Sequence, residues 1–381
     1  MIEHPRHNLN ENIVVYSVEQ LNRLYLEAKI DYATLPYDIV ISCLADEYGE
    51  KFLFGDWIDF DDTTHGLYQK HNFPGFFLAV QTFLAQSRSV YIIVPQRAPV
   101  SSQFNHHLLN FIEFNEFYGL YHRIFDKYYG KCKIKTNPSK KFTMLNKRLR
   151  PSRLYSFANI VHNNLCNKGI VSLLAHGDAD MNCFDNTLFT SMCSLLENHA
   201  PKDFDSETLQ KVKQMVPFEN SVNTKITDDF LDTGGWIPDI AAFDNSFVDV
   251  IHETHENLPP GSQIFTEKTM RSIFLGKPFL LIGSAGSLNE LHKLGFKTFN
   301  DFWPEDYDLE PNLFDRVDMV LQLLYKICDT PYTNLREMRG EMQQVFDYNQ
   351  QNLKNLSDRL ESKLQTIDQF INSKRVRMHG S

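Results

Sequence analysis

The segment 264–299 constrains the fold of this chain more than any other part of the sequence. It reads IFTEKTMRSIFLGKPFLLIGSAGSLNELHKLGFKTF. Thr266 is a favourable helix N-cap, and Gly276 stands where that helix is expected to end. The unbroken apolar run 278–282 is typical of a strand that is covered on both faces. A glycine-containing turn and a second helix follow. The pattern therefore predicts a helix–strand–helix piece of an open parallel sheet.

The start of the first of these helices carries residues that suit a nucleotide diphosphate. The N–H groups at a helix start are oriented to bind phosphate. Lys268 adds a positive charge, and Glu267 can accept hydrogen bonds from sugar hydroxyls. The alternative is an ordinary capped helix in a Rossmann-like domain, because an acidic residue also suits the first turn of any helix. We prefer nucleotide binding.

Length and composition limit the class of protein. The chain has 381 residues, of which 42% are hydrophobic and 23% are charged, as expected of a soluble protein with two domains. No apolar stretch approaches the roughly 18 residues of a membrane span. The N-terminal residues do not resemble a secretory signal, and the six cysteines are scattered without a CxxC pair. We therefore expect a cytoplasmic protein with reduced thiols and no membrane partner.

Positive charge is concentrated in one part of an acidic chain. The net charge of −10 argues against a protein that coats nucleic acid indiscriminately. The window 127–177 nevertheless has no acidic residue and carries eleven lysines and arginines. A solvated basic face is one interpretation, and concentrated phosphate binding is the one that we prefer.

The order of apolar and helical patterns predicts an α/β protein with two Rossmann-like domains and a helical extension. The first domain is expected at 1–136, with strands at 12–16, 37–43 and 90–94 and helices at 18–28, 76–85 and 108–129. The second is expected at 137–310, with strands at 141–145, 169–174 and 247–251, a helix at 153–163 and a helical stretch around 186–236. In the extension, 311–378, apolar residues recur near the helical period, so we expect it to pack back on the chain.

Two segments of the second domain resemble a known family of enzymes. The triplet Thr266-Glu267-Lys268, which follows NSFVDVIHET, resembles the donor-binding motif of the α-1,3-fucosyltransferases. The segment KKFTMLNKRLRPSRLYSF resembles the family's element in which an arginine at a helix start meets the donor diphosphate. GKPFLLIGSAGSLNELHKLGFKTF is similar to glycosyltransferase-like proteins of tailed phages and large DNA viruses. The resemblance does not extend to the N-terminal third.

The resemblance implies a GT-B-like fold, in which two Rossmann-like domains face a cleft, and a donor site in the second domain. Glu267 would bind the ribose hydroxyls, Lys268 the diphosphate, and Arg153 or Arg150 the diphosphate from the other side. Phe265 stands where the family often has tyrosine, which leaves the identity of the donor open. The same pocket would also be lined or flanked by Thr266, Asn245, Ser246 and Glu253.

The catalytic base is not carried over from the resemblance. A transfer with inversion needs a carboxylate or histidine within reach of the acceptor hydroxyl. The acidic, aromatic segment FGDWIDFDDTTHG offers Asp56, Asp59 and His65, and Glu113 is a further candidate. Each of them alone is more often a solvated surface residue.

A metal-dependent alternative rests on Asp178 and Asp180, which follow an apolar strand as a DxD pair. Such a pair can hold a divalent cation that bridges a donor diphosphate. Because Arg153, Lys268 and a helix start already supply positive charge, we expect no metal cofactor.

Together these patterns predict a monomeric glycosyltransferase that uses a nucleotide-diphosphate sugar as co-substrate. The phage-like resemblance and the basic window suggest duplex DNA as partner, with hydroxymethylcytosine as the acceptor reached in the groove or after base flipping. A glycan or protein acceptor, or a catalytically silent nucleotide-binding or DNA-binding module, is the alternative. The basic residues that we expect to contact DNA are Lys131, Lys133, Lys135, Lys140, Lys141, Lys147 and Arg148.

Overall fold

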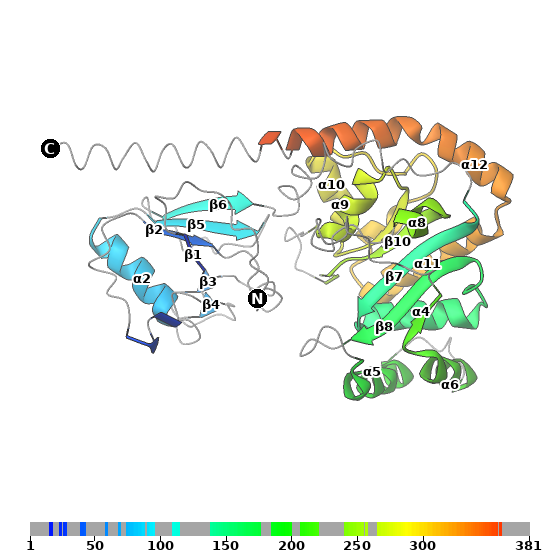
Figure 1. Ribbon diagram of the computed structural model, residues 1–381, viewed down its shortest axis with the longest axis horizontal. Coiled ribbons are helices and arrows are strands. Elements are labelled where there is room, and N and C mark those ends of the chain that lie inside the picture. Colours follow the sequence, from blue (N-terminus) through cyan, green and yellow to red (C-terminus); the bar gives the residue numbers. More distant parts are fainter. Residues whose placement is uncertain are drawn as a thin grey trace. The chain divides into compact units, whose positions relative to one another are not determined.

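The computed structural model divides the chain into two compact units (Figure 1). The second unit consists of Arg123–Asn257 and Phe265–Lys354, and the first unit takes the rest of the chain. The structure describes residues 15–17, 23–24, 26–28, 39–42, 58–59, 68–69, 74–87, 90–95, 109–114, 138–176, 184–199, 206–220, 240–254, 256–257, 265–356 and 358–359.

The first unit contains a parallel sheet of four strands in the order β1-β2-β5-β6. A separate pair of short parallel strands, β3 and β4, lies outside this sheet. Helix α2 buries Ala79, Val80 and Phe83, which are spaced so that they share one helical face. The elements are β1 (Val15–Ser17), β2 (Ile39–Ser42), β3 (Ile58–Asp59), β4 (Tyr68–Gln69), α2 (Pro74–Ala85), β5 (Val90–Pro95) and β6 (Leu109–Phe114).

The prediction of a helix across 108–129 is wrong for the first part of that segment, because Leu109–Phe114 form strand β6. The segment LNFIEF pairs in parallel with all six residues of β5. A short apolar and aromatic run does not distinguish a strand from a buried helix by its pattern, and here pairing with the edge of the sheet decides the outcome. Residues 115–129 lie outside the described part of the chain.

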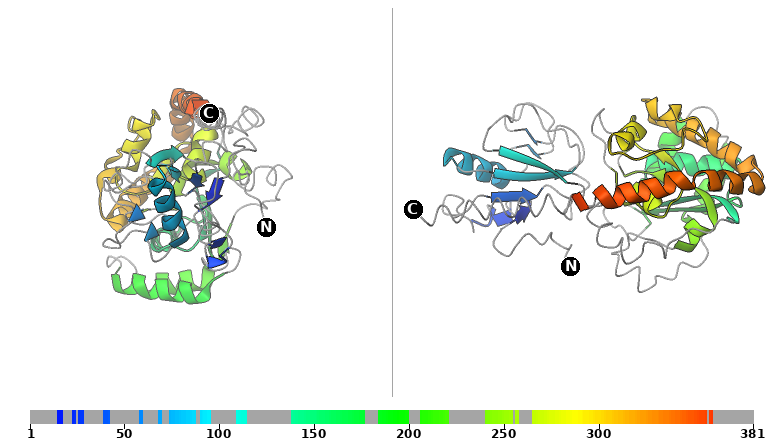
Figure 2. Two further views of the ribbon diagram at one scale, coloured as in Figure 1. Left: turned by 90° about the vertical axis from the view of Figure 1, so that its left-hand side faces the viewer. Right: turned by 90° about the horizontal axis from the view of Figure 1, so that it is seen from above.

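The second unit is built on a sheet of five strands in the order β11-β10-β7-β8-β9, all parallel except β9 (Figures 1 and 2). The strands predicted at 141–145, 169–174, 247–251 and 278–282 are all present. Their observed bounds are β7 (Lys140–Arg148), β8 (Gly169–His176), β9 (Phe218–Glu219), β10 (Ser246–His252) and β11 (Phe279–Ile282).

The direction of winding reverses between β7 and β10. From β7 the chain runs through α4 (Pro151–His162) to β8 on one side, and later returns to β10 on the other side of β7. It then continues through α9 (Glu267–Phe274) to β11, farther out on that side. In an open α/β sheet such a reversal is the topological switch point, where ligands bind outside the carboxyl ends of the strands.

The helices of this unit form a core on the sheet. Tyr155 of α4 packs edge-on against Phe314 of α11, with ring centroids 5.3 Å apart, and α4 also contacts α6. On β10, Asp249 accepts hydrogen bonds from Thr143 of β7 and from Ser272 of α9. The remaining helices are α5 (Asn186–His199), α6 (Ser206–Met215), α8 (Ile240–Asp244), α10 (Ser287–Lys293), η3 (Asp306–Leu309), α11 (Leu313–Asp329) and α12 (Tyr332–Glu341).

The helical segment after α12 packs back on the second unit, as expected for this part of the chain. Phe346 and Leu353 are buried, and the side chain of Phe346 lies near Phe299. Gln350 donates to the carbonyl of Phe274 at the end of α9, at 2.8 Å. Figures 1 and 2 show this orange-to-red segment lying beside α9 and α10. Within the described residues, no helix is both long enough and apolar enough to cross a membrane.

Candidate functional site at the switch point

Three segments meet at the carboxyl ends of β7 and β10. They are the residues after β7, the residues after β10 and the start of α9. Arg153 of α4 donates to the carbonyl of Arg148 at the end of β7 and to that of Glu253 after β10, at 3.2 and 3.0 Å. Glu253 in turn accepts from the backbone N–H of Thr266, at 3.1 Å. The switch point therefore brings together segments about 100 positions apart in the sequence.

Thr266 begins helix α9 as the sequence predicted. Its hydroxyl oxygen accepts from the N–H of Lys268, and its backbone is extended, as expected of an N-cap. The predicted end of the helix is also confirmed, because Gly276 has a φ of 61°, which favours glycine. Local sequence thus fixes both ends of the helix that carries the triplet.

Lys268 and Glu267 form an ion pair at the start of α9. The ammonium of Lys268 lies 2.8 Å from the carboxylate of Glu267 and 3.0 Å from the hydroxyl of Thr254. Burial alone would raise the pKa of Glu267, but the charge of Lys268 and its hydrogen bond bring the pKa below its usual value. Both side chains keep about a fifth of their surface exposed, at 19% and 23%. Both side chains are therefore partly open to solvent.

Arg153 is placed at the same edge but is buried. Its guanidinium donates to three backbone carbonyls, those of Arg148, His252 and Glu253. Its Nε lies 3.7 Å from the carboxylate of Glu256. Burial lowers the pKa of Arg153, and the charge of Glu256 opposes that shift. In this arrangement Arg153 ties the ends of β7 and β10 together, and its predicted contact with a diphosphate stays a prediction.

Arg150 stands at the N-cap position of α4, directly before Pro151. Its side chain donates to the carbonyl of Leu149 at 2.9 Å and is partly exposed. Proline at the first position of a helix is favourable because its missing N–H needs no partner there. Arg150 is thus the more accessible of the two arginines that the sequence offered for diphosphate binding.

A buried polar cluster beneath the edge was not found from the sequence. The carboxylate of Glu256 accepts from Ser152 and lies 3.1 Å from Nδ1 of His252. Burial lowers the pKa of His252. Burial would raise the pKa of Glu256, but the hydrogen bond from His252, the charge of Arg153 and the bond from Ser152 lower it overall. The one feature of the sequence that could have pointed to this cluster is that His252 and Glu256 stand four residues apart.

The second helix start of the 264–299 segment is already occupied by a protein carboxylate. Asp308 accepts from the N–H groups of Leu288 and Asn289 in α10, at 2.9 and 3.3 Å. Gly286, with a φ of 85°, donates its N–H to the carbonyl of Asp308. Both helix starts therefore have a carboxylate against them, Asp308 at α10 and Glu253 at α9, and only the start of α9 has a partly exposed ion pair beside it.

Two residues predicted for the donor pocket are not brought to this edge. Ser246 is the first and His252 the last of the seven residues of β10, so the two ends of the strand lie about 20 Å apart. It is buried, donates to the carbonyl of Ala242 and accepts from Lys277. Asn245 lies next to it, where its carbonyl accepts from the N–H of Lys140. The prediction that Asn245 and Ser246 line the same pocket as the triplet is corrected. They lie at the start of β10, whereas the triplet lies near the end of that strand.

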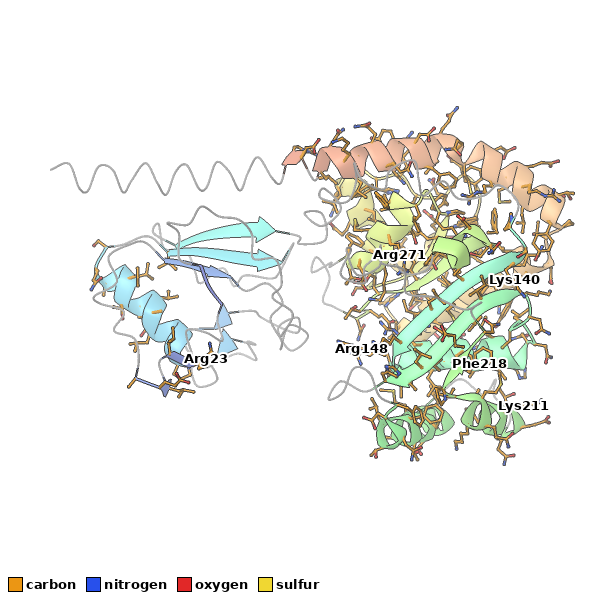
Figure 3. All side chains as sticks on the ribbon, in the orientation of Figure 1. Arg23, Lys140, Arg148, Lys211, Phe218 and Arg271 are labelled. Atoms are coloured by element: carbon orange, nitrogen blue, oxygen red, sulfur yellow. The ribbon has the colours of Figure 1, made fainter. Side chains whose placement is uncertain are left out.

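The basic window is divided between the two ends of the sheet. Lys140 and Lys141 begin β7, whereas Lys147 and Arg148 end it; Figure 3 shows Lys140 and Arg148 at opposite ends of the strand. Lys141 is buried, donates to the carbonyl of Thr330 and lies over the ring of Tyr332. The described part of the window is therefore not one continuous patch. Lys131, Lys133 and Lys135 lie outside the described residues.

The candidate bases belong to the first unit. Asp59 lies in β3 and Glu113 in β6, while Asp56 and His65 lie outside the described residues. Asp178 and Asp180, the metal-dependent alternative, also lie outside them. Within the described part of the chain, no group of three or more His, Cys, Asp or Glu residues is arranged to hold a metal ion.

Comparison with known proteins adds no assignment. The chain matches no family model, no curated protein and no solved structure. The class of fold, α/β with a mostly parallel five-stranded sheet of Rossmann-like order, is therefore given by the strand order and the crossovers themselves.

Proposed function

We propose that this protein is a glycosyltransferase that binds a nucleotide-diphosphate sugar at the carboxyl edge of β7 and β10. The observation that carries the proposal is the partly exposed ion pair of Glu267 and Lys268 at the start of α9, directly beside the topological switch point. Anion-binding helix starts and switch points are each common in α/β proteins. Their coincidence with a partly exposed ammonium group, that of Lys268, favours a diphosphate ligand.

The proposed binding event is an exchange of partners. A donor diphosphate replaces Glu267 as the partner of Lys268, which releases the Glu267 carboxylate to accept from ribose hydroxyls. The ammonium then stabilises the charge that grows on the leaving nucleotide. Arg150, partly exposed at the start of α4, supplies a second positive charge from the β7 side. In this scheme Arg153 keeps the two strand ends in register.

The GT-B-like arrangement and the acceptor belong to the same proposal. The first unit, itself a parallel α/β sheet, would bind the acceptor and supply the base from Asp56, Asp59 or His65. The acceptor suggested by the sequence is hydroxymethylcytosine in duplex DNA. Of the described residues that we expected to contact DNA, Lys147 and Arg148 lie at the donor edge, so they are the ones that this acceptor would need.

Release of free nucleotide diphosphate tests the proposal directly. The purified chain is incubated with a panel of uridine-, guanosine- and thymidine-diphosphate sugars, with and without hydroxymethylated DNA. We expect turnover with one donor, and a loss of about a hundredfold in Lys268→Met, since removing one preorganised charge contact to the leaving group costs about 3 kcal/mol. Lys140→Met, at the amino edge, is the matched control. Failure of every donor to bind or turn over would remove the proposal.

A further inference from the structure

Glu253 is a buried carboxylate surrounded by hydrogen-bond donors. It follows β10 by one residue and is 1% exposed. It accepts from the backbone N–H groups of Thr254 and Thr266 and from the hydroxyls of Thr266 and Thr269. A carboxylate accepts hydrogen bonds only, so it is the one side-chain group of this size that satisfies four donors at once.

The two oxygens of this carboxylate have different partners. Oε1 accepts from the Thr266 N–H and from the Thr269 hydroxyl, at 3.1 and 2.5 Å, and so fixes the start of α9. Oε2 accepts from the Thr254 N–H and from the Thr266 hydroxyl, at 3.2 and 2.5 Å. Thr254 and Thr266 are also the two residues whose hydroxyl oxygens lie near the Lys268 ammonium, at 3.0 and 3.4 Å.

The bond from Thr266 to Oε2 sets the direction of its hydroxyl. Because the hydroxyl hydrogen points at Glu253, the lone pairs of the oxygen face the N–H and the ammonium of Lys268. A neutral amide at position 253 would present an N–H to Thr254 or Thr266, both of which donate. The orientation of the Thr266 hydroxyl beside Lys268 thus depends on Oε2 of Glu253 being an acceptor.

We propose that Glu253 is a positioning residue that holds the Lys268 ammonium in place through Thr254 and Thr266. Lysine has a long and flexible side chain, so a diphosphate site built on it gains affinity when the ammonium is held before the ligand arrives. This role in binding rests on the proposed function, whereas the positioning of the ammonium can be measured without any ligand.

The ligand-free test measures how fast trace acylation labels individual lysines, read by peptide mass spectrometry. Glu253→Gln is expected to label Lys268 about fivefold faster than the parent, the effect of losing about one net hydrogen bond. Lys293, which is bonded to Glu290, serves as the internal reference and keeps its rate. Thr269→Val is the matched control: it removes a partner of Oε1 alone and leaves the Lys268 rate unchanged.

If Glu253→Gln does not fold, the less disruptive variant Thr254→Val decides the test. Thr254→Val keeps the N–H that bonds to Glu253 and removes the hydroxyl that accepts from Lys268. It is expected to raise the labelling of Lys268 in the same direction. Unchanged labelling of Lys268 in the folded variants, or equal acceleration in Thr269→Val, would overturn the positioning role.

A binding cycle separates this inference from the proposed function. The affinity for uridine and guanosine diphosphate is measured by calorimetry in the parent, Glu253→Gln, Lys268→Met and the double variant. If Glu253 acts through Lys268, the double variant binds no more weakly than Lys268→Met. Fully additive losses would overturn the inference. If the parent binds neither probe, the proposed donor site loses its support, and the labelling result alone decides the positioning of Lys268.

Discussion

The two edges of the second unit's sheet both collect positive side chains, but they bind them in different ways. At the amino edge, Lys140, Lys141 and Lys277 all donate to backbone carbonyls. The acceptors are the carbonyls of Asn167 at 2.7 Å, of Thr330, and of Phe243 at 2.6 Å together with that of Ser246; the Ser246 hydroxyl also accepts from Lys277. Backbone carbonyls cannot turn away, so these bonds hold helix and loop ends against the sheet.

At the carboxyl edge, Lys268 has a different set of acceptors. Within the described part of the chain they are all side-chain oxygens, those of Thr254, Thr266 and Glu267. Side chains can rotate and Glu267 is partly exposed, and in the proposed scheme an incoming anion replaces Glu267 as the partner of Lys268. The two groups of lysines thus differ in the kind of acceptor that holds them, and the proposal assigns ligand binding to the group held by side chains.

Arg153 tests this distinction because it lies at the carboxyl edge but is bound like the amino-edge lysines. Arg153→Met should reduce the free energy of unfolding by about 3–5 kcal/mol, since it leaves Glu256 as a buried charge without its cation. Chemical denaturation measures the change, with Arg150→Met as control, for which less than about 1 kcal/mol is expected. A loss of nucleotide affinity without a loss of stability in Arg153→Met would make it a ligand contact instead.

Lys268→Met should do the opposite of Arg153→Met: it should weaken ligand binding strongly and change the free energy of unfolding little. Losing a charge-assisted contact of about 1.5–3 kcal/mol weakens nucleoside diphosphate binding by about 10- to 150-fold. The free energy of unfolding should change by no more than about 0.5 kcal/mol, because the side chain is partly exposed. Calorimetric titration and denaturation are compared with Lys140→Met. Equal effects on affinity at both edges would break the distinction.

The buried His252 predicts how stability depends on pH. Burial lowers its folded pKa below the usual value of about 6.5, so the unfolded chain binds more protons in the range below that value. The free energy of unfolding should therefore fall as pH drops from about 6.5 towards the lowered pKa. His252→Gln should flatten this part of the stability–pH curve relative to the parent. A curve of unchanged slope would mean that His252 has the same pKa in the folded and the unfolded chain.

The smallest expected effect concerns DNA. If duplex DNA is the acceptor, Lys147→Gln at the donor edge should reduce the slope of log affinity against log salt by about 0.9 for one lost phosphate contact. Lys141→Gln should leave that slope unchanged, because Lys141 is buried against Tyr332 and Thr330. Equal slopes in both variants, or no salt dependence at all, would remove Lys147 or DNA from the scheme.

The prediction from sequence was most reliable where the structure is decided locally. The N-cap at Thr266, the helix end at Gly276 and the strand over 279–282 are all present. Each depends on residues within one or two turns of the chain. The helix predicted over 109–114 was wrong for the opposite reason. The local pattern there is ambiguous, and pairing with β5 decides the secondary structure.

The candidate site was predicted in part. Arg153 and the triplet meet at one edge, whereas Ser246 begins β10 at its other end. A residue's distance from a motif in sequence says nothing about which end of a strand it occupies until the strand direction is known. Glu256 was overlooked because its partners, Ser152 and Arg153, lie about 100 positions away in the chain.

The sequence by itself determined strands β7, β8, β10 and β11 of the second unit, the ends of α9 and the residues of the triplet, because capping bonds and apolar periodicity act over a few residues. It did not determine β9, which lies in a stretch that we expected to be helical. The tertiary structure alone decided that Arg153 is held by strand carbonyls, that Glu253 faces four donors and that the basic window is divided. These outcomes depend on the parallel order of β7 and β10, which brings distant segments to a common edge where their polar groups must satisfy one another.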